Sequence, residues 1–482
     1  MDDLTAVLLP DAGRVIVKLF VPGDEATTRR PSRAARLAGR IAAMAQSEVD
    51  GLLGETLRRF SDRHDDLESV FLHHYELMRH RVTGSAGLSR SHRQLIGAYF
   101  SAEYAVEAAA LCNPSMTPHP DQSGLDEGQL RVVISLRQIG EGHLSSIGFA
   151  AAVLGPGDRL TISPRTGSLA VGQRIATRHR RDLLAGGLAE AGWDNEVAAT
   201  VLSLLPDVFD DGQFDSALTQ VPADLMSRST SARNLEQLRR TLASSYTVTF
   251  PADVPLERRV LWPSAPEERN GMEDARFTRL ADGSYVATYT AYDGREINSR
   301  MLISADLRTF DVNPLRGPAS AGKGMAFFPR EVNGRRLALS RCDGETLGLS
   351  SLDENTTWQS PVPLHTPGQG WELIQTGNCG SPLETEAGWL VLTHGVGPMR
   401  RYAMSAILLD LGQPEQVIAR LPEILLAPAD EDRFGYVPNV VYSCGGLIHD
   451  GLLWLPYGVG DTRVRFASME LEGLLRTMVE SS

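Results

Sequence analysis

Cysteine is scarce in this sequence, and its scarcity limits the kinds of site that the chain can build. Only four cysteines occur among 482 residues, at Cys112, Cys342, Cys379 and Cys444, and no two of them have C-x-x-C spacing. We therefore expect neither a disulfide framework nor a metal site, and free thiols suit a reducing compartment. A cytoplasmic location is the expectation that follows.

Basic clusters and long hydrophobic runs are also missing. The formal net charge is -13 and no run of Lys and Arg forms a basic block, whereas nucleic-acid binders need a positive face to displace counterions. The opening MDDLTAVLLPDAGRVIVKLF has acids where a secretory signal peptide needs bases. No apolar run approaches the roughly 18 residues that a bilayer span requires. We expect no nucleic-acid partner and no membrane partner.

Two stretches show helical periodicity. Apolar residues recur at helical spacing from about residue 32 to 110, with Ser89 or Ser91 available as an N-cap. A second helical stretch, at about 176–246, interrupts β-rich sequence on both sides. The length of the chain and its 42% hydrophobic content allow two to three domains with a sizeable core.

The rest of the chain contains a repeat. A glycine followed by an apolar strand recurs five times, in EGQLRVVISLR, DGSYVATYTAY, NGRRLALSRCD, AGWLVLTHGVG and DGLLWLPYGVG. The repeat glycines are Gly128, Gly283, Gly334, Gly388 and Gly451. From Gly283 onward, beyond the second helical stretch, their spacing of about 50 to 65 residues suits one four-stranded propeller blade per repeat. A β-sandwich is the alternative, because repeated hairpins also occur there.

The predicted fold is therefore mainly β, a five-bladed β-propeller made of residues 112–166 and 247–476. We expect residues 1–110 to form a helical N-terminal segment, residues 111–482 to form the propeller domain, and 176–246 to be a helical insertion between the first two blades. The inner strand of each blade lines the central channel, so polar residues near its end face a ligand. Those ends carry Arg137, Tyr289 to Tyr292, Arg341, His394 and Asp461.

The segment GMEDARF, residues 271–277, has two interpretations. Glu273 and Asp274 could form a salt-bridged loop with Arg276, or one of them could be a proton donor in a cleft. Chemistry at an anomeric carbon needs such a donor for the leaving oxygen. The surrounding cationic or protonatable residues exceed what a neutral sugar requires and suggest an oxyanion, of which inorganic phosphate is the commonest; they are Arg137, Lys323, Arg341 and His394.

These motifs together resemble glycoside hydrolase family 130, the inverting β-mannoside phosphorylases and β-mannosidases built on a five-bladed propeller. The matching stretches are GMEDARF, GKGMAFFPREVNGRRLALSR, GNCGSPLETEAGWLVLTHGVG and GYVPNVVYSCGGLIHDGLLWLPYGVGDTRV, with a weaker match in CNPSMTPHPDQSGLDEGQLRVVISLR. They cover about residues 112–165 and 247–476. The two helical stretches lie outside the part that most members share.

The resemblance implies a role for individual residues. Asp274 falls on the family's general acid, which protonates the glycosidic oxygen through the sugar's own 3-hydroxyl, and Glu273 becomes a hydrogen-bonding support. Ala275 departs from the proline that the motif normally carries. The phosphate positions of the family fall on Lys323, Arg341 and His394, and on Gln375, where many phosphorylases have a lysine. Asp461, Arg137 and Asn113 correspond to positions that hold the mannosyl ring.

The resulting hypothesis is an inverting β-mannoside phosphorylase that takes a β-mannosyl oligosaccharide and phosphate to α-mannose 1-phosphate, without a metal or an organic cofactor. The first alternative is a β-mannosidase on the same scaffold, with a base among Glu384, Glu386 and Glu273, because an inverting hydrolase needs two separated carboxyl groups. A mannosyl transferase and a non-catalytic sugar-binding propeller are the others. The linkage, the acceptor sugar and a homo-oligomer are left open by the sequence.

Overall fold

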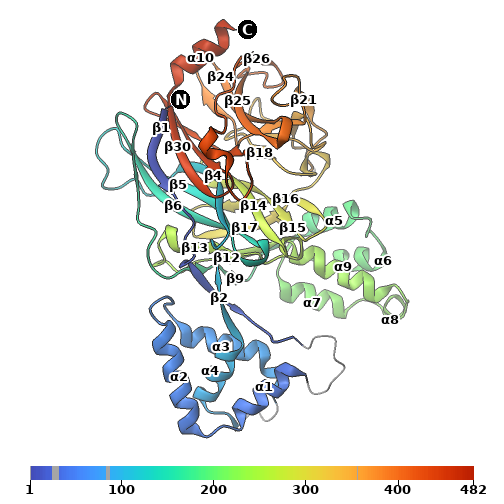
Figure 1. Ribbon diagram of the computed structural model, residues 1–482. Coiled ribbons are helices and arrows are strands. Elements are labelled where there is room, and N and C mark those ends of the chain that lie inside the picture. The colour runs from blue at the N-terminus through green and yellow to red at the C-terminus, as the bar shows by residue number, and fades with distance from the viewer. Residues whose placement is uncertain (1, 24–31, 83–86, 355, 482) are drawn as a thin grey trace. The chain divides into compact units, whose positions relative to one another are not determined.

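The computed structural model describes residues 2–23, 32–82, 87–354 and 356–481 (Figure 1). The chain divides into two compact units. A β-rich unit comprises Met1–Pro10, Ala109–Arg165 and Val171–Ser482, and a helical unit comprises Asp11–Ala108 and Thr166–Ala170. Residues 24–31 and 83–86 of the predicted N-terminal segment lie outside the described residues. No helix in the described ranges is long and apolar enough to cross a membrane.

The described residues of the helical unit form four α-helices and a short strand pair. The helices are α1 (Arg33–Ala42), α2 (Gln46–Phe60), α3 (Leu67–Met78) and α4 (Arg90–Tyr99), and strand β2 (Val15–Leu19) pairs with β3 (Ser101–Ala105). Ser89, one of the two N-cap candidates, accepts the His92 amide at 3.2 Å at the start of α4. Gly97 lets α4 approach α3, since a Cβ at Gly97 would lie 1.7 Å from the Phe71 carbonyl oxygen.

The β-rich unit is mainly β, built from successive antiparallel strand groups. The first group comprises β4 (Ala110–Pro118), β5 (Leu130–Ile139), β6 (Ser145–Gly155) and β7 (Arg159–Ile162). The second comprises β14 (Gly271–Arg279), β15 (Tyr285–Tyr292), β16 (Ile297–Ser304), β17 (Thr309–Pro314), β12 (Tyr246–Thr249) and β9 (Gln173–Ile175). Between β6 and β14 the register contains a single parallel pair, Gly271 with Ser145, and through this pair the two groups belong to one 12-stranded sheet.

Three further groups follow along the chain. They comprise β18 (Ala326–Phe327), β19 (Leu337–Ser340), β20 (Leu347–Ser351) and β21 (Val362–His365); then β22 (Gln375–Asn378), β23 (Leu383–Thr385), β24 (Gly388–Val396), β25 (Tyr402–Leu409) and β26 (Val417–Arg420); and then β27 (Val441–Tyr442), β28 (Leu447–His449), β29 (Leu452–Val459) and β30 (Arg463–Glu470). Helix α10 (Leu471–Glu480) follows the last strand.

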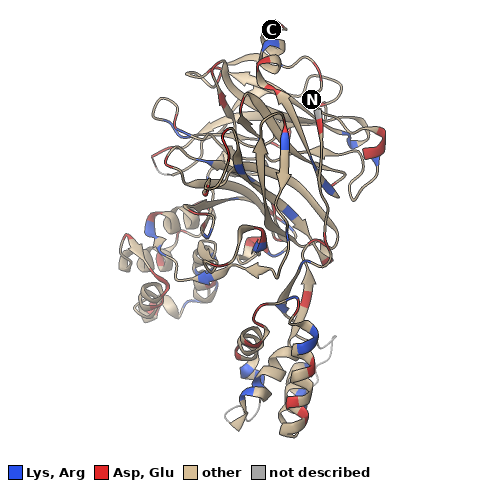
Figure 2. Ribbon diagram, turned by 90° about the vertical axis from the view of Figure 1, so that its left-hand side faces the viewer, with Lys and Arg blue, Asp and Glu red and all other residues tan. Residues whose placement is uncertain are grey.

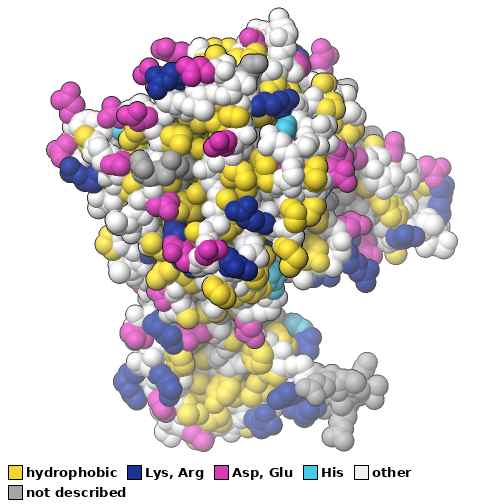
Figure 3. Space-filling view, turned by 45° about the horizontal axis from the view of Figure 1, so that its top comes forward, with side chains coloured by type: hydrophobic (Ala, Val, Ile, Leu, Met, Phe, Trp, Pro, Cys, Tyr) yellow, Lys and Arg dark blue, Asp and Glu magenta, His cyan; other side chains and the backbone are white. Residues whose placement is uncertain are grey.

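Hydrophobic clusters lie between consecutive groups, as burial of each apolar sheet face requires. One cluster joins Phe328 and Leu339 of the third group to Trp389 of the fourth. Another joins the last group back to the first, through Trp454 and Ile134. Acidic and basic residues are scattered over the ribbon (Figure 2), and the surface hydrophobic side chains lie among charged ones (Figure 3).

Strand β1 (Asp2–Leu8) was not expected from the sequence. It pairs antiparallel with β30, with Asp2 opposite Ser468 and Leu8 opposite Val464, and therefore belongs to the last strand group. Leu8 is buried there against Val464 and Phe466. The structure thus places the first residues in the β-rich unit, whereas the sequence analysis assigned them to the helical segment.

Helices occupy the stretch between β9 and β12. They are α5 (Arg181–Glu190), α6 (Glu196–Leu204), α7 (Asp211–Thr219), α8 (Ala223–Met226) and α9 (Ser231–Ala243), with a short pair of strands, β10 (His179–Arg180) and β11 (Val208–Phe209), between them. Asp210 and Gln213 form a capping box at the start of α7. The helices share a core of their own, which includes Leu188, Val201 and Phe214.

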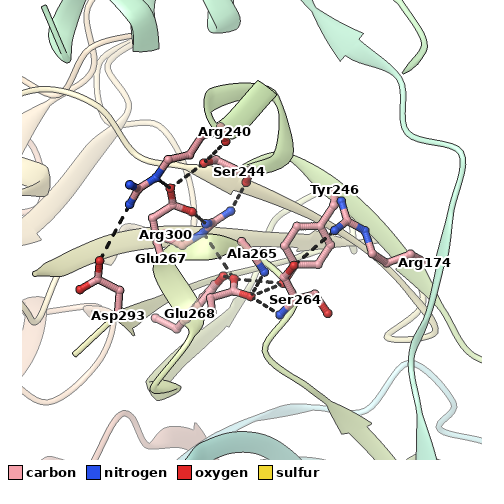
Figure 4. A network of polar contacts seen from close by, with 11 residues as sticks. Arg174, Arg240, Ser244, Tyr246, Ser264, Ala265, Glu267, Glu268, Asp293 and Arg300 are labelled. Carbon is pink, nitrogen blue, oxygen red and sulfur yellow. Dashed lines mark hydrogen bonds and ion pairs between the residues drawn. The ribbon is translucent and has the colours of Figure 1, made fainter. Parts of the chain in front are cut away.

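A buried polar network connects the end of α9 to the second strand group (Figure 4). Arg300 of β16 donates to Glu267 at 3.1 Å and to the Ser244 carbonyl oxygen, and its Nε lies 3.6 Å from Glu268. Glu268 also accepts hydrogen bonds from the hydroxyls of Tyr246 and Tyr289. The side chains of Arg300 and Glu268 are 1% and 0% exposed, so the pair lies in the protein interior.

Candidate functional site

Asp274 lies on a β-bulge at the start of β14. Glu273 pairs with Thr290 and Arg276 pairs with Thr288, so Asp274 and Ala275 together oppose a single residue of β15. Asp274 has a φ of 56°, in the left-handed region that non-glycine residues seldom adopt. This strained bulge changes the direction of the Asp274 side chain relative to a regular strand, which is how active-site residues are often placed.

The Asp274 carboxylate accepts hydrogen bonds from two side chains of the first strand group. The Asn113 amide donates to Oδ1 at 2.6 Å, and an Arg137 guanidinium nitrogen lies 3.4 Å from the same oxygen. Burial raises the pKa of Asp274, but the charges of Arg137, Arg276 and Lys323 and the Asn113 hydrogen bond outweigh it and lower that pKa to about 2. Asp274 is therefore a carboxylate in the unliganded protein.

Glu273 connects two of the predicted cations. Its Oε1 accepts from Arg137 at 2.7 Å and its Oε2 accepts from the Lys323 ammonium at 2.7 Å. The Glu273 side chain is 7% exposed, whereas the Lys323 side chain is 36% exposed, so Lys323 extends from this buried pair toward solvent. The structure therefore brings together five predicted residues in one chain of contacts: Asn113, Arg137, Glu273, Asp274 and Lys323.

Arg276 and Tyr442 are site residues that the sequence analysis did not assign. The buried Arg276 guanidinium donates to the Asp274 carbonyl oxygen at 2.8 Å and to the Tyr442 hydroxyl at 2.8 Å. The salt-bridged loop considered for GMEDARF paired Arg276 with the acids, but the observed partners of those carboxylates are Arg137 and Lys323. Arg276 could have been assigned to the site because it lies two residues from Asp274 in the sequence. Nothing in the sequence indicated that Tyr442 belongs to the site.

Arg341 and His394 form a second pair near this cluster. Arg341 follows β19 directly, and its Nη1 lies 3.4 Å from Nε2 of His394 on β24. Burial, together with the charges of Arg341 and Arg276, holds the pKa of His394 well below its ordinary value. His394 is therefore neutral and accepts a hydrogen bond from Arg341. The sequence analysis counted it among the positive groups, and its burial beside two guanidinium groups makes that expectation wrong.

Asp461 occupies the tight turn between β29 and β30, with a φ of 49°. Burial and the negative charges of Asp274 and Glu273 raise its pKa to about 6, against the opposing effect of Arg137 and Arg400. A Cβ added to Gly458, near the end of β29, would lie 3.1 Å from the Asn113 amide nitrogen, so this end of β29 lies beside the cluster. Gln375 is the first residue of β22, two residues before Gly377, whose added Cβ would lie 3.2 Å from the Arg341 side chain.

The Asp461→Asn variant should be more stable than the wild-type protein at neutral pH. Folding raises the Asp461 pKa from 3.8 to about 6, so the stabilising effect of the protonated form is present below pH 3.8 and is lost as pH rises through 6. We expect the variant to gain about 1–3 kcal/mol in unfolding free energy at pH 7.5 and nothing near pH 4. Urea denaturation at both pH values measures this difference. An equal effect at the two pH values would contradict it.

Several buried polar atoms in this region have no protein partner among the described residues. They are Asn113 Oδ1, Arg276 Nε, Arg341 Nε and Asn378 Oδ1. Buried donors and acceptors are nearly always satisfied, so such atoms together indicate a place for a polar ligand or water. The positive charges of Arg137, Arg276, Lys323 and Arg341 lie near the carboxyl groups of Glu273, Asp274 and Asp461. The site can therefore hold an anion next to a carboxyl group that exchanges protons.

Two features lie apart from this site. Glu384, a base candidate for hydrolysis, accepts from Arg330 at 2.8 Å in an ion pair whose side chains are 41% and 42% exposed, and Glu386 is also exposed.

A cavity of about 960 Å³ lies between helices α5 and α9 and the second and third strand groups, lined by Leu184, Phe327 and Trp358 among others. None of the predicted site residues lines it. Among the described residues no cluster of three His, Cys, Asp or Glu could hold a metal ion.

Comparison with known proteins gives consistent matches. The family model of glycoside hydrolase family 130, described as beta-1,4-mannooligosaccharide phosphorylase, matches residues 241–480. The chain is 29% identical over 223 residues to a 1,2-beta-oligomannan phosphorylase of Thermoanaerobacter sp. (strain X514), covering 45% of this chain and 75% of that protein. It is 32% identical over 220 residues to a beta-1,2-mannobiose phosphorylase of the same organism, covering 45% and 72%.

A solved structure is also similar. It is the beta-1,2-mannobiose phosphorylase from Listeria innocua in complex with beta-1,2-mannobiose, with a TM-score of 0.47 and 20% identity. The match covers 79% of this chain and 94% of that chain.

Proposed function

The chain belongs to glycoside hydrolase family 130, and from this membership we propose that it is an inverting β-mannoside phosphorylase. It takes a β-mannosyl di- or oligosaccharide and inorganic phosphate to α-mannose 1-phosphate and a shortened acceptor. The relatives that match are named as phosphorylases of mannobiose or oligomannan. The observation that supports phosphate as nucleophile is the group of cations beside Asp274, with unsatisfied guanidinium Nε atoms on Arg276 and Arg341.

Asp274 is the proposed general acid. Its pKa of about 2 in the unliganded protein is set by nearby cations, and a phosphate dianion bound beside Lys323 and Arg341 would neutralise much of that positive potential. The Asp274 pKa then rises, so the carboxyl group takes up a proton when phosphate binds. Phosphate attacks the anomeric carbon, the glycosidic bond breaks, and the proton passes from Asp274 through the sugar's 3-hydroxyl to the leaving oxygen. Positioning and electrostatic stabilisation supply much of the catalysis.

Other residues hold the two substrates. Lys323 and Arg341 provide the charge for phosphate, and neutral His394 fixes the orientation of Arg341 through their 3.4 Å contact. Gln375 contributes an amide but no charge. Asn113, Arg137 and Asp461 bind the mannosyl ring, and Glu273 fixes Arg137 and Lys323. The reaction needs no metal and no organic cofactor.

Hydrolysis receives less support from the geometry of the candidate bases. Glu384 is engaged by Arg330 at the surface, and Glu273 is engaged by Arg137 and Lys323. Glu386, the third candidate, is exposed at the surface. An inverting hydrolase needs a second carboxyl group that activates a water molecule, and no contact of these three residues favours one of them for that role.

The proposed architecture is a five-bladed propeller with the helices of 181–243 inserted between the first two blades. The five antiparallel strand groups support the number of five blades. The first two groups are joined by a single residue pair between β6 and β14. The hydrophobic cluster that joins the last group to the first supports a closed ring. A cytoplasmic location accords with the four free cysteines, all outside disulfides in the structure.

The experiment that tests the function is phosphate titration. With β-1,2-, β-1,3- and β-1,4-mannobiose and mannosyl-glucose as a panel, we expect mannose 1-phosphate from an accepted substrate, at a rate that falls to zero without phosphate. The Arg341→Ala variant should need much more phosphate for half-maximal rate, because a charge-assisted hydrogen bond is roughly twice as strong as a neutral one. The Gln375→Lys variant should bind phosphate equally well or more tightly. Free mannose at an undiminished rate without phosphate would identify water as the nucleophile.

A further inference from the structure

The cavity of about 960 Å³ in the β-rich unit has two kinds of wall. One wall belongs to the helices between β9 and β12, with Leu184 of α5 and Leu242 of α9. The other belongs to the second and third strand groups and includes Val286 of β15 and Met301 of β16. Figure 1 shows α5 and α9 beside β15 and β16. The cavity therefore lies where the helices meet the strand groups.

Each wall of the cavity belongs to a hydrophobic core of its own. Leu184 and Leu242 are members of the core that the helices share, whereas Val286, Phe327 and Trp358 are members of a separate cluster within the strand groups. The two clusters have no member in common, so the two apolar surfaces face the cavity instead of packing directly on each other. Protein interiors are packed as densely as organic crystals, and unfilled apolar space costs stability in proportion to its volume. A space of this size between two cores therefore indicates a place for a ligand.

The lining of the cavity suits a hydrocarbon. Ile303 of β16 lines the cavity and is 38% exposed, so apolar surface reaches solvent there. The Phe327 and Trp358 rings stack with centroids 5.2 Å apart and form an aromatic part of the lining. The volume falls within the roughly 300–1,000 Å³ of small-molecule sites. A sugar would leave hydroxyls unpaired against these side chains, which costs binding free energy.

The charged residues of the lining are mostly positive. The whole chain carries a formal net charge of -13, yet five arginines and three acids line the cavity. The arginines are Arg178, Arg180, Arg316, Arg330 and Arg336, and the acids are Asp282, Asp311 and Glu331. A pocket lined by an excess of positive charge attracts anions. The ligand that matches this lining therefore combines a hydrocarbon body with a negative group.

Arg178 is the arginine that can hold the negative group. It lies in the segment between β9 and β10, its side chain is exposed, and it forms no hydrogen bond or ion pair with the described residues. Three other arginines of the lining already have acidic partners, which are Asp182 for Arg180, Glu384 for Arg330 and Glu331 for Arg336. A guanidinium group binds a carboxylate or a phosphate through charge-assisted hydrogen bonds. Arg178 is therefore available to a ligand at the cavity.

We propose that this cavity binds an amphipathic anion, with an unbranched alkyl chain between the two cores and a carboxylate or phosphate head group on Arg178. Leu184 and Leu242 contact the chain from the helices, and Val286 and Met301 contact it from the strands. None of the residues assigned to the proposed phosphorylase site lines the cavity, so this binding site is separate from that function.

Calorimetric titration of the full-length protein tests the proposal, with laurate, dodecyl phosphate and dodecanol as probes, each below the concentration at which it aggregates. We expect at least one of the two anions to bind one to one, with a dissociation constant in the micromolar range. Dodecanol should bind about tenfold more weakly, because it has the same chain but forms no charge-assisted hydrogen bond with Arg178. Tighter binding of laurate would identify a fatty acid as the ligand class, and tighter binding of dodecyl phosphate would identify an alkyl phosphate. Absence of saturable binding by both anions, or equal binding of dodecanol, would overturn the proposal.

Substitutions separate the head group from the chain. Arg178→Ala should weaken binding of the anion about tenfold and leave dodecanol binding unchanged. Met301→Trp should prevent binding of both, because the larger side chain occupies the space between the cores. The matched control is Arg239→Ala on α9, since Arg239 is also exposed, forms no hydrogen bond or ion pair with the described residues and does not line the cavity. Equal weakening in Arg178→Ala and Arg239→Ala would show attraction by overall charge and would overturn the assignment of Arg178.

Fluorescence locates the bound chain. Trp358 lines the cavity and is 5% exposed, so a fatty acid that carries bromine on its chain should quench this tryptophan when it binds. Trp358→Phe should remove most of the quenching and keep the affinity within about twofold. Quenching that is unchanged in Trp358→Phe would place the chain elsewhere on the protein and overturn the proposal. These measurements record binding alone, so their outcome is independent of whether turnover requires phosphate.

Discussion

Asp274→Asn is expected to lower turnover of a mannobiose by about 10²- to 10⁴-fold, the usual contribution of general acid catalysis. The amide keeps the shape of the side chain, and its oxygen can still accept the Asn113 hydrogen bond that measures 2.6 Å in the structure. It cannot deliver an acidic proton to the leaving oxygen. Steady-state rates at saturating phosphate, with circular dichroism to confirm folding, measure the effect.

The leaving group provides the control for this prediction. An activated aryl β-mannoside needs little protonation of its leaving oxygen, so the loss in Asp274→Asn should be much smaller with that substrate. A purely structural role for Asp274 would reduce both rates equally. A folded variant that keeps more than about a tenth of the mannobiose activity would show that another group donates the proton.

Arg300→Met is expected to destabilise the β-rich unit by about 3–5 kcal/mol, the typical cost of leaving one partner of a buried ion pair uncompensated. Arg300 and Glu268 are 1% and 0% exposed, so water cannot solvate the carboxylate that remains. The change also removes the hydrogen bond from Arg300 to the Ser244 carbonyl oxygen at the end of α9 (Figure 4). Denaturant unfolding monitored by tryptophan fluorescence measures the loss.

The matched control is Arg336→Met. Arg336 lies 3.2 Å from Glu331 in an ion pair whose side chains are 70% and 52% exposed, and exposed pairs contribute about 0–1 kcal/mol. Equal destabilisation by the two substitutions would show that the buried pair contributes no more to the free energy of unfolding than the exposed pair.

Much of the β architecture could be predicted from the glycine-led repeat. The five repeat glycines precede or begin β5, β15, β19, β24 and β29, which occupy corresponding places in the five strand groups. Gly388 at a φ of 152° and Gly451 at 72° occupy backbone conformations that favour glycine. This explains why glycine recurs at the same position of each repeat. Strand β1 could not be predicted, because its partner β30 lies at the other end of the sequence and DDLTAVL has no turn that fixes its register.

The sequence predicted only part of the observed cluster of polar residues, and none of its electrostatics. Motif positions identified Asp274, Arg137 and Lys323, and the structure brings them together. Whether His394 is charged depends on its burial beside Arg341 and Arg276, and those neighbours come from different strand groups. The bulge at Asp274 likewise follows from the register between β14 and β15, which no single strand encodes.

The pairing of β1 with β30 has a consequence for how the protein is made. During synthesis from the N-terminus, Asp2–Leu8 leaves the ribosome long before its partner Arg463–Glu470 exists. At a synthesis rate of about 5–20 residues per second, the backbone groups of β1 stay unpaired for tens of seconds. The strand can pair with β30 only after the rest of the chain has been made. Completion of the last sheet is therefore a late, post-translational event, and the nascent chain needs protection of that waiting strand against pairing with another chain.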